Sequence, residues 1–140
     1  MTPSAIEQAL DRRHATAQRA FAERDIAAYR DLFGSALQYR QIDGVTIDRT
    51  RLMRDVAAQF AKIRRAESRF TRERLDVAGD DVRETLIQTA VVEVAAFGFL
   101  RRVWQIERRG DYVWAMGDGD WRIVRVTILE EDVRGRFRLG

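Results

Sequence analysis

His14 has the most distinctive chemistry in this 140-residue chain, because no other histidine is present. An imidazole gains and loses a proton near neutral pH, so His14 could act as a proton acceptor or donor. It falls in an apolar stripe of helical spacing with Ile6, Leu10, Ala17 and Phe21, which places it on the inner face of a helix. The same position also suits a histidine that only packs in the core or at the edge of a dimer.

Tyr39 and Gln41 are the next candidates, because they alternate with Leu37 onto one face of a short strand pattern. Tyr39 offers a phenol that can orient a carbonyl group, or it packs in the core with its hydroxyl at the rim. Gln41 can hold a polar group by hydrogen bonds but cannot act as a base. We therefore expect both residues to bind substrate if this face meets His14.

Two tryptophans and an aspartate complete the candidate site. Trp104 and Trp114 share a later strand pattern and could form an apolar wall for a flat ligand, although such residues also serve as core or dimer contacts. Asp111 is the candidate catalytic carboxylate beside His14, unless it only occupies a bulge next to Gly110. With one histidine and no cysteine, we expect no metal site.

The stretch "GDGDWRIVRVTI" at 117–128 contains the spacing G-x-G, which could begin a phosphate-binding loop. Such a loop must lead into a helix, because the helix N-terminus supplies the amides and the dipole that hold phosphate. Here the glycines lead into a strand pattern, and the two aspartates would repel phosphate. The stretch therefore predicts a hairpin turn and no nucleotide cofactor.

Three helices are predicted before the strands that end the chain. The residues expected to cap their N-termini are Ser4 with Glu7 as a capping box, Asp25, and Asp48 or Thr50. Gly34 is expected to end the second, short helix. Asp43-Gly44 is a strong hairpin signal. The predicted strands are 36–42, 45–47, 69–78, 83–97, roughly 102–116, and 121–131.

The composition fits one folded α+β domain over residues 1–140, with 46% hydrophobic and 34% charged residues. Lys62 is the only lysine among 25 basic residues, and the arginines alternate with acidic residues, so the net charge is only +3. A nucleic-acid surface would segregate the arginines, so we expect no nucleic-acid partner. The longest apolar run, 94–100, is too short to span a membrane, and the N-terminus lacks the pattern of a secretory signal. We therefore expect a cytoplasmic protein without a membrane partner.

The order of elements, with "ALQYRQIDGVTID" at 36–48 and "GDGDWRIVRVTIL" at 117–129, resembles the nuclear transport factor 2-like superfamily. Its SnoaL-like and ketosteroid isomerase-like members are the most similar, and the likeness covers roughly residues 4 to 132. The resemblance implies a cone-shaped, curved antiparallel sheet packed against three N-terminal helices, known as a cystatin-like α+β roll. It also implies a homodimer and a pocket inside the cone.

The resemblance does not carry the catalytic residues of ketosteroid isomerases. Their aspartate base falls on Gln41 and their tyrosine donor on Ala17, while their second donor falls near Asp111. Because Gln41 cannot act as the base and Ala17 cannot donate a hydrogen bond, two of the three catalytic groups are missing, and we do not expect that reaction.

Two functional hypotheses remain. In the first, the chain is a SnoaL-like enzyme without a cofactor, an isomerase, cyclase or hydrolase acting on a small apolar molecule such as a polyketide or a steroid-like ketone. His14 would then transfer a proton, and Tyr39 and Gln41 would orient a polar group. In the second, it is a non-catalytic ligand-binding or homodimerisation module. A cavity that brings His14 and Tyr39 together favours the first hypothesis, and a cavity filled by side chains favours the second.

Overall fold

The computed structural model describes residues 2–139, which form three helices and six strands. The helices are α1 (Pro3–Glu23), α2 (Ile26–Asp31) and α3 (Arg49–Phe60). The strands are β1 (Phe33–Arg40), β2 (Thr46–Ile47), β3 (Ile63–Ala78), β4 (Asp81–Phe97), β5 (Leu100–Gly117) and β6 (Asp120–Leu139). Within the described range, no helix has the length and apolar character needed to cross a bilayer.

Side chains cap all three helices, but the predicted capping box of α1 is wrong. Thr2 is the N-cap, and its hydroxyl accepts a hydrogen bond from the backbone N–H of Ala5 at 3.1 Å. Pro3 occupies the first turn, where its missing N–H costs nothing, so the helix begins before Ser4. The predicted caps of the other two helices, Asp25 and Asp48, are confirmed.

Gly34 does not end α2, contrary to the sequence prediction. The helix stops at Asp31, with Leu32 as its C-cap, and Gly34 lies inside β1. A Cβ at this position would lie 3.3 Å from Val124 Cγ1 on β6. The glycine therefore allows a close approach between two strands.

The two predicted turns are confirmed. In the Asp43-Gly44 turn the Asp43 carboxylate accepts a hydrogen bond from the Val45 N–H at 2.9 Å, and Gly44 has a φ of 87°. Asp118 and Gly119 both have positive φ, of 51° and 80°. This is the backbone that a two-residue hairpin between β5 and β6 requires. The glycines at 117–119 therefore form a hairpin and no phosphate loop.

The sheet has the strand order β2-β1-β6-β5-β4-β3, and its four long strands form an antiparallel meander. One pair departs from the predicted antiparallel sheet, because β1 runs parallel to β6. The Ile123 N–H donates to the Leu32 carbonyl at 2.8 Å, which joins the start of β1 to the start of β6. The chain enters β1 directly from α2, beside the start of β6. This connection therefore sets the direction of β1.

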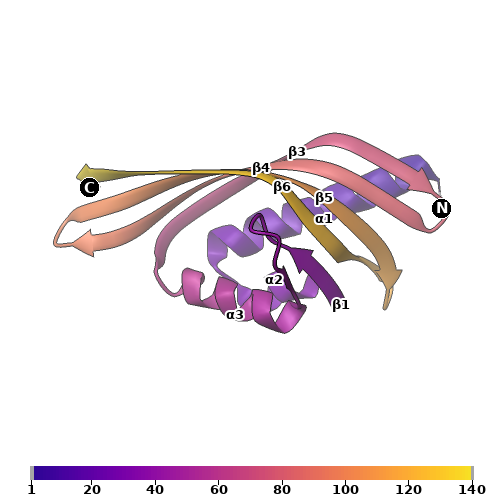
Figure 1. The fold of residues 1–140 in the computed structure, drawn as a ribbon, viewed down its shortest axis with the longest axis horizontal. Coiled ribbons are helices and arrows are strands. Elements are labelled where there is room, and N and C mark those ends of the chain that lie inside the picture. Colours follow the sequence, from indigo (N-terminus) through magenta and orange to yellow (C-terminus); the bar gives the residue numbers. More distant parts are fainter. Residues whose placement is uncertain (1, 140) are drawn as a thin grey trace.

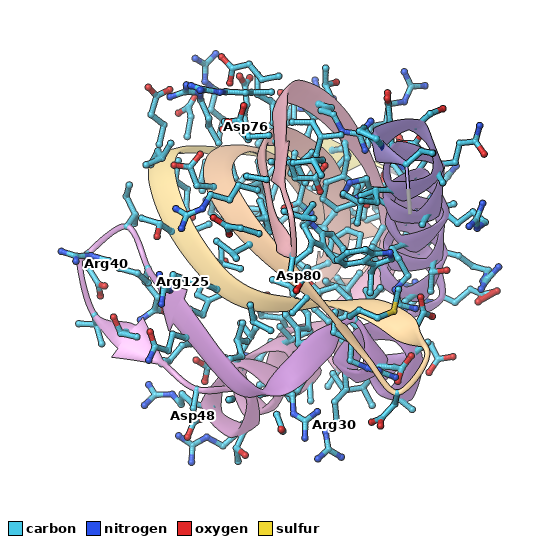
Figure 2. All side chains as sticks on the ribbon, turned by 90° about the vertical axis from the view of Figure 1, so that its right-hand side faces the viewer. Arg30, Arg40, Asp48, Asp76, Asp80 and Arg125 are labelled. Atoms are coloured by element: carbon cyan, nitrogen blue, oxygen red, sulfur yellow. The ribbon has the colours of Figure 1, made fainter. Side chains whose placement is uncertain are left out.

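The curved sheet wraps around the helices, which lie against its concave face (Figure 1). The core between them includes the fully buried side chains of Leu10, Val82, Leu86, Trp114 and Val126. Charged side chains lie around the outside, as the labelled residues Arg30, Arg40, Asp48, Asp76, Asp80 and Arg125 illustrate (Figure 2). The predicted α+β roll with three helices is therefore confirmed.

The meander extends beyond the helices as an arm, which contains the C-terminal end of β6 (Figure 1). We use this name for residues 63–68, 90–97, 100–106 and 132–139. The predicted ends of two strands were wrong here, because β3 begins at Ile63 and β6 continues to Leu139. Arginines alternate with Val133 and Phe137 along this part of β6, so charged residues occupy one face while the backbone stays paired with β5.

Arg13 is a buried cation that joins three elements at the end of the cone. Its Nε donates to the Trp121 carbonyl on β6 at 2.9 Å, and its Nη2 donates to the Asp31 carbonyl of α2 at 2.9 Å. Its Nη1 lies 3.1 Å from an Asp120 carboxylate oxygen. A single side chain thus fixes α1 against α2 and the start of β6.

Replacing Arg13 with methionine should lower the free energy of unfolding by about 2 to 4 kcal/mol, because the buried Trp121 carbonyl and the partly buried Asp31 carbonyl lose a charged donor. Urea unfolding followed by circular dichroism measures the change. The neighbouring exposed Arg12→Met on the same helix is the control, with an expected effect of about 0.5 kcal/mol or less. Equal losses in the two variants would contradict a role for the Arg13 hydrogen bonds.

Candidate functional site

His14 faces a buried carboxylate that the sequence prediction did not include. Its Nε2 atom lies 2.8 Å from Oε1 of Glu84 on β4, at an angle outside that of a hydrogen bond. The Glu84 side chain is completely buried, and the His14 side chain is 13% exposed. The His14 ring also packs against Phe70 and, edge to face, against Trp114, with centroid distances of 5.3 and 5.7 Å. Its orientation is therefore fixed by packing on three sides.

Two side chains donate hydrogen bonds to the Glu84 carboxylate. Trp114 Nε1 donates to Oε1 at 2.8 Å, and Arg72 Nε donates to Oε2 at 3.0 Å. Arg72 continues to the surface, where its Nη2 lies 2.8 Å from an Asp11 carboxylate oxygen on α1. A buried carboxylate needs such partners, because an uncompensated charge in the interior costs several kcal/mol. Glu84 is therefore placed as a fixed negative charge behind His14.

A cavity of about 40 Å³ lies in front of His14, between α1, α2 and the concave face of the sheet. We call it the inner cavity. Its lining residues are Arg13, His14, Ala17, Tyr29, Leu32, Phe33, Tyr39, Phe70, Leu86, Gln88, Arg108, Tyr112, Trp114 and Ile123. The volume suffices for a few water molecules or for one functional group of a ligand. A steroid-sized molecule does not fit inside it.

All three tyrosines of the chain line the inner cavity. Burial raises the pKa of Tyr29 to about 12, and the nearby Tyr39 adds to this rise. Burial also raises the pKa of Tyr39 and of Tyr112, while the positive charge of Arg108 opposes each rise. The three phenols therefore stay protonated at neutral pH and can donate hydrogen bonds to a ligand oxygen.

Arg108 lies where the inner cavity meets two open grooves. Its Nε donates to a Glu131 carboxylate oxygen on β6 at 2.8 Å. One groove, of about 290 Å³, passes between α3 and the loop that joins β1 to β2. The other, of about 390 Å³, runs along the arm. We call them the α3 groove and the arm groove, and Arg108 and Gln88 line both of them as well as the inner cavity.

The structure brings together three of the residues singled out in the sequence. His14, Tyr39 and Trp114 all line the inner cavity. Gln41 lines the α3 groove beside Tyr39, and Trp104 lines the arm groove.

Asp111 does not join this group. Its carboxylate accepts a hydrogen bond from the Thr85 hydroxyl at 2.6 Å, and neither residue lines the inner cavity. Asp111 alternates with the buried Gly110 and Tyr112 along β5, so it belongs to the opposite face of the sheet. Among residues 2–139, no three acidic or histidine side chains gather as a metal-binding group.

Sequence reasoning missed Glu84, although a signal for it was present. The segment Val82, Glu84, Leu86 and Gln88 alternates onto one face of β4, and all four residues are buried. A carboxylate at an inward position of such a strand must be paired, and the only histidine of the chain was an available partner. Tyr29, Tyr112 and Arg108 gave no comparable signal, because their meeting depends on the curvature of the sheet.

Arg72→Met should lower the free energy of unfolding by about 2 to 4 kcal/mol, because it leaves the buried Glu84 charge without its cation. Arg74→Met on the same strand is the matched control. Its side chain is 71% exposed and pairs with the exposed Asp76, so a change of about 0.5 kcal/mol or less is expected. Urea unfolding at pH 7 compares the two variants. Similar losses would show that Glu84 does not depend on Arg72.

The raised tyrosine pKa values predict instability at high pH. Above about pH 10 the tyrosines of the unfolded chain lose their protons, while those of the folded chain keep them until a higher pH. The free energy of unfolding should therefore fall as the pH rises from about 10 towards 12. Urea unfolding at several pH values measures this, and the phenolate absorbance of the folded protein should remain low near pH 10. An ordinary titration near pH 10 would contradict the burial of these hydroxyls.

No protein-family model and no curated protein matches this chain by sequence. Solved structures do match it. A conserved protein from Planctomyces limnophilus is 12% identical with a TM-score of 0.77, over 90% of this chain and 99% of that one. A hexachlorocyclohexane dehydrochlorinase is 12% identical with a TM-score of 0.67, over 93% and 89% of the two chains.

A third similar structure belongs to a protein described as NTF2-like. The NTF2-like protein from Cytophaga hutchinsonii is 14% identical with a TM-score of 0.65, over 91% of this chain and 98% of that one. Similarity at this level of identity establishes architecture and leaves activity open. The resemblance found in the sequence is therefore confirmed for the fold: the chain has the nuclear transport factor 2-like α+β fold.

Proposed function

We propose that this chain is a cofactor-independent enzyme that moves a proton on a carbonyl compound, with His14 as the base. The observation that carries the proposal is the contact of His14 with the fully buried Glu84 at the wall of the inner cavity. A positioned base is the first requirement of such chemistry, and a carboxylate behind an imidazole orients it and stabilises its protonated form. The sequence alone offered a histidine without a partner.

We assign different tasks to the two ring nitrogens of His14. Glu84 faces Nε2, and its negative charge favours a proton on that nitrogen. Nδ1 then carries the lone pair and is the atom that accepts a proton from a ligand. The proton would leave a carbon next to the carbonyl, and its electron pair would move onto the carbonyl oxygen to form an enolate. Return of the proton to another carbon completes an isomerisation, and loss of a leaving group completes an elimination.

The enolate oxygen needs hydrogen-bond donors in a site with little water. Tyr29, Tyr39 and Tyr112 supply protonated phenols at neutral pH, and Arg108 adds a positive charge. Structural neighbours include the hexachlorocyclohexane dehydrochlorinase and a scytalone dehydratase candidate from Novosphingobium aromaticivorans. Loss of HCl or of water with formation of a double bond also removes a proton from carbon, which agrees with the role that we assign to His14.

A second candidate function is a non-catalytic module that binds a ligand or a second copy of the chain, and the small volume of the inner cavity favours it. A homodimer is compatible with both functions and is part of our proposal. We also propose a cytoplasmic location, because a chain without cysteine does not depend on an oxidising compartment.

The enzymatic proposal predicts that the protein catalyses exchange of α-protons for deuterium in ketones and enones dissolved in D2O. Proton NMR of the ketone measures the exchange rate directly. His14→Gln should lower this rate at least about 100-fold, because the amide cannot accept the proton. Tyr39→Phe should lower it about tenfold by removing one donor to the enolate oxygen.

Thermal unfolding with and without the ketone serves as the binding control for both variants. Stabilisation of His14→Gln by the ketone, with exchange abolished, would support a catalytic His14. Exchange that survives in His14→Gln would overturn its role as the base. Binding without exchange in the unaltered protein would favour the non-catalytic module.

A further inference from the structure

The arm groove offers the space that the inner cavity lacks. It holds about 390 Å³, against about 40 Å³ in front of His14. Arg108 and Gln88 line both spaces, so the groove and the inner cavity adjoin at these two side chains. The groove is therefore the neighbouring space into which the rest of a ligand held at His14 would extend.

Apolar side chains dominate the lining of the arm groove. They come from α1, β3 and the three long strands that follow: Phe21, Ile63, Ala90, Val92, Val94, Trp104, Ile106 and Val133. Burial of an apolar ligand surface on such a lining is favourable by about 25 cal/mol per Å². The α3 groove differs, because Asp43 and Asp55 add carboxylates to its lining. An apolar ligand is therefore accommodated better along the arm.

Trp104 is held in place at the far part of this groove. Its ring packs over Gly135 of β6, where a Cβ would lie 2.6 Å from the nearest ring atom. The Arg102 guanidinium lies 4.2 Å from the ring centroid and 4.9 Å from that of Phe137. The glycine and the arginine together fix the indole, so the groove has a formed apolar end before a ligand arrives.

The strand geometry sets the length of ligand that this groove suits. Arg108, at the mouth of the inner cavity, and Trp104 are four residues apart on β5. At about 3.3 Å per residue they are roughly 13 Å apart, which matches an extended chain of about ten carbons.

We propose that the ligand is an elongated amphiphile, with a carbonyl head in the inner cavity and an unbranched apolar chain that lies in the arm groove and reaches Trp104. The inference rests on the proposed function, because it takes His14 and the tyrosines as the site of the head group. It replaces the small apolar molecule expected from the sequence, such as a polyketide or a steroid-like ketone, with an elongated one. Trp104 and Gly135 are then the residues that determine the preferred chain length.

The test uses a series of unbranched methyl ketones from 2-butanone to 2-dodecanone, whose chain beyond the carbonyl reaches ten carbons, with dissociation constants measured by isothermal titration calorimetry. Each added methylene that enters the groove should tighten binding about two- to fourfold. Trp104→Ala should remove this gain for the longest ketones and leave the shortest ones unchanged. Gly135→Ala keeps the indole but displaces it, and it should reduce the same gain.

Met116→Ala is the matched control, because Met116 is an exposed apolar residue of β5 that lines neither the inner cavity nor either groove. It should keep the full dependence on chain length. Affinity that does not change with chain length, or a dependence that survives in both Trp104→Ala and Gly135→Ala, would overturn the proposal. If the dependence is present but no ketone exchanges its α-protons, the groove assignment stands and the catalytic proposal fails.

Discussion

The burial of one carboxylate determines how the cone of this protein is assembled. Glu84 has no exposed side-chain surface, and a charge in that position is tolerated only with close partners. Its partners come from α1, β3 and β5, in the form of His14, Arg72 and Trp114. The helix therefore cannot shift along the sheet without breaking contacts to a buried charge. The same contacts that fix α1 also orient the imidazole at the cavity wall, so stability and the candidate chemistry depend on one cluster.

Much of the fold follows from local rules that the sequence displays. Asp25 and Asp48 cap their helices, and the Asp-Gly pairs at 43–44 and 118–119 form the expected turns. These features depend on neighbours in the chain, so their outcome is settled by local geometry. The parallel pairing of β1 with β6 was not predictable in this way, because it depends on where α2 delivers the chain. The extension of β6 was missed for another reason: alternating arginines can lie on one face of a paired strand as easily as at its solvated end.

The candidate site was only partly predictable from the sequence. The residues that were found and those that were missed differ in a physical way. His14 and Tyr39 were found because each lies in a periodic pattern whose inward face can be identified from the sequence. Asp111 was placed by counting along the chain, and the alternation of β5 puts it on the opposite face from Tyr112. Arg108 is followed by another arginine, and no sequence pattern singles it out. The curvature of the sheet nevertheless places it against the tyrosines. Sites of this kind combine residues from several strands, and only the register of those strands reveals them.

The sizes of the cavities limit what the site can accept. An inner cavity of about 40 Å³ surrounded by three tyrosines, a histidine and two arginines can enclose a functional group but not a whole organic ligand. Enclosure of only the reacting group would be enough for catalysis, because hydrogen bonds and charges act most strongly where water is excluded. The rest of a ligand can then remain partly exposed in a groove and still contribute binding energy. A division between a small polar chamber and a long apolar groove therefore reconciles a tightly packed core with the binding of a large molecule.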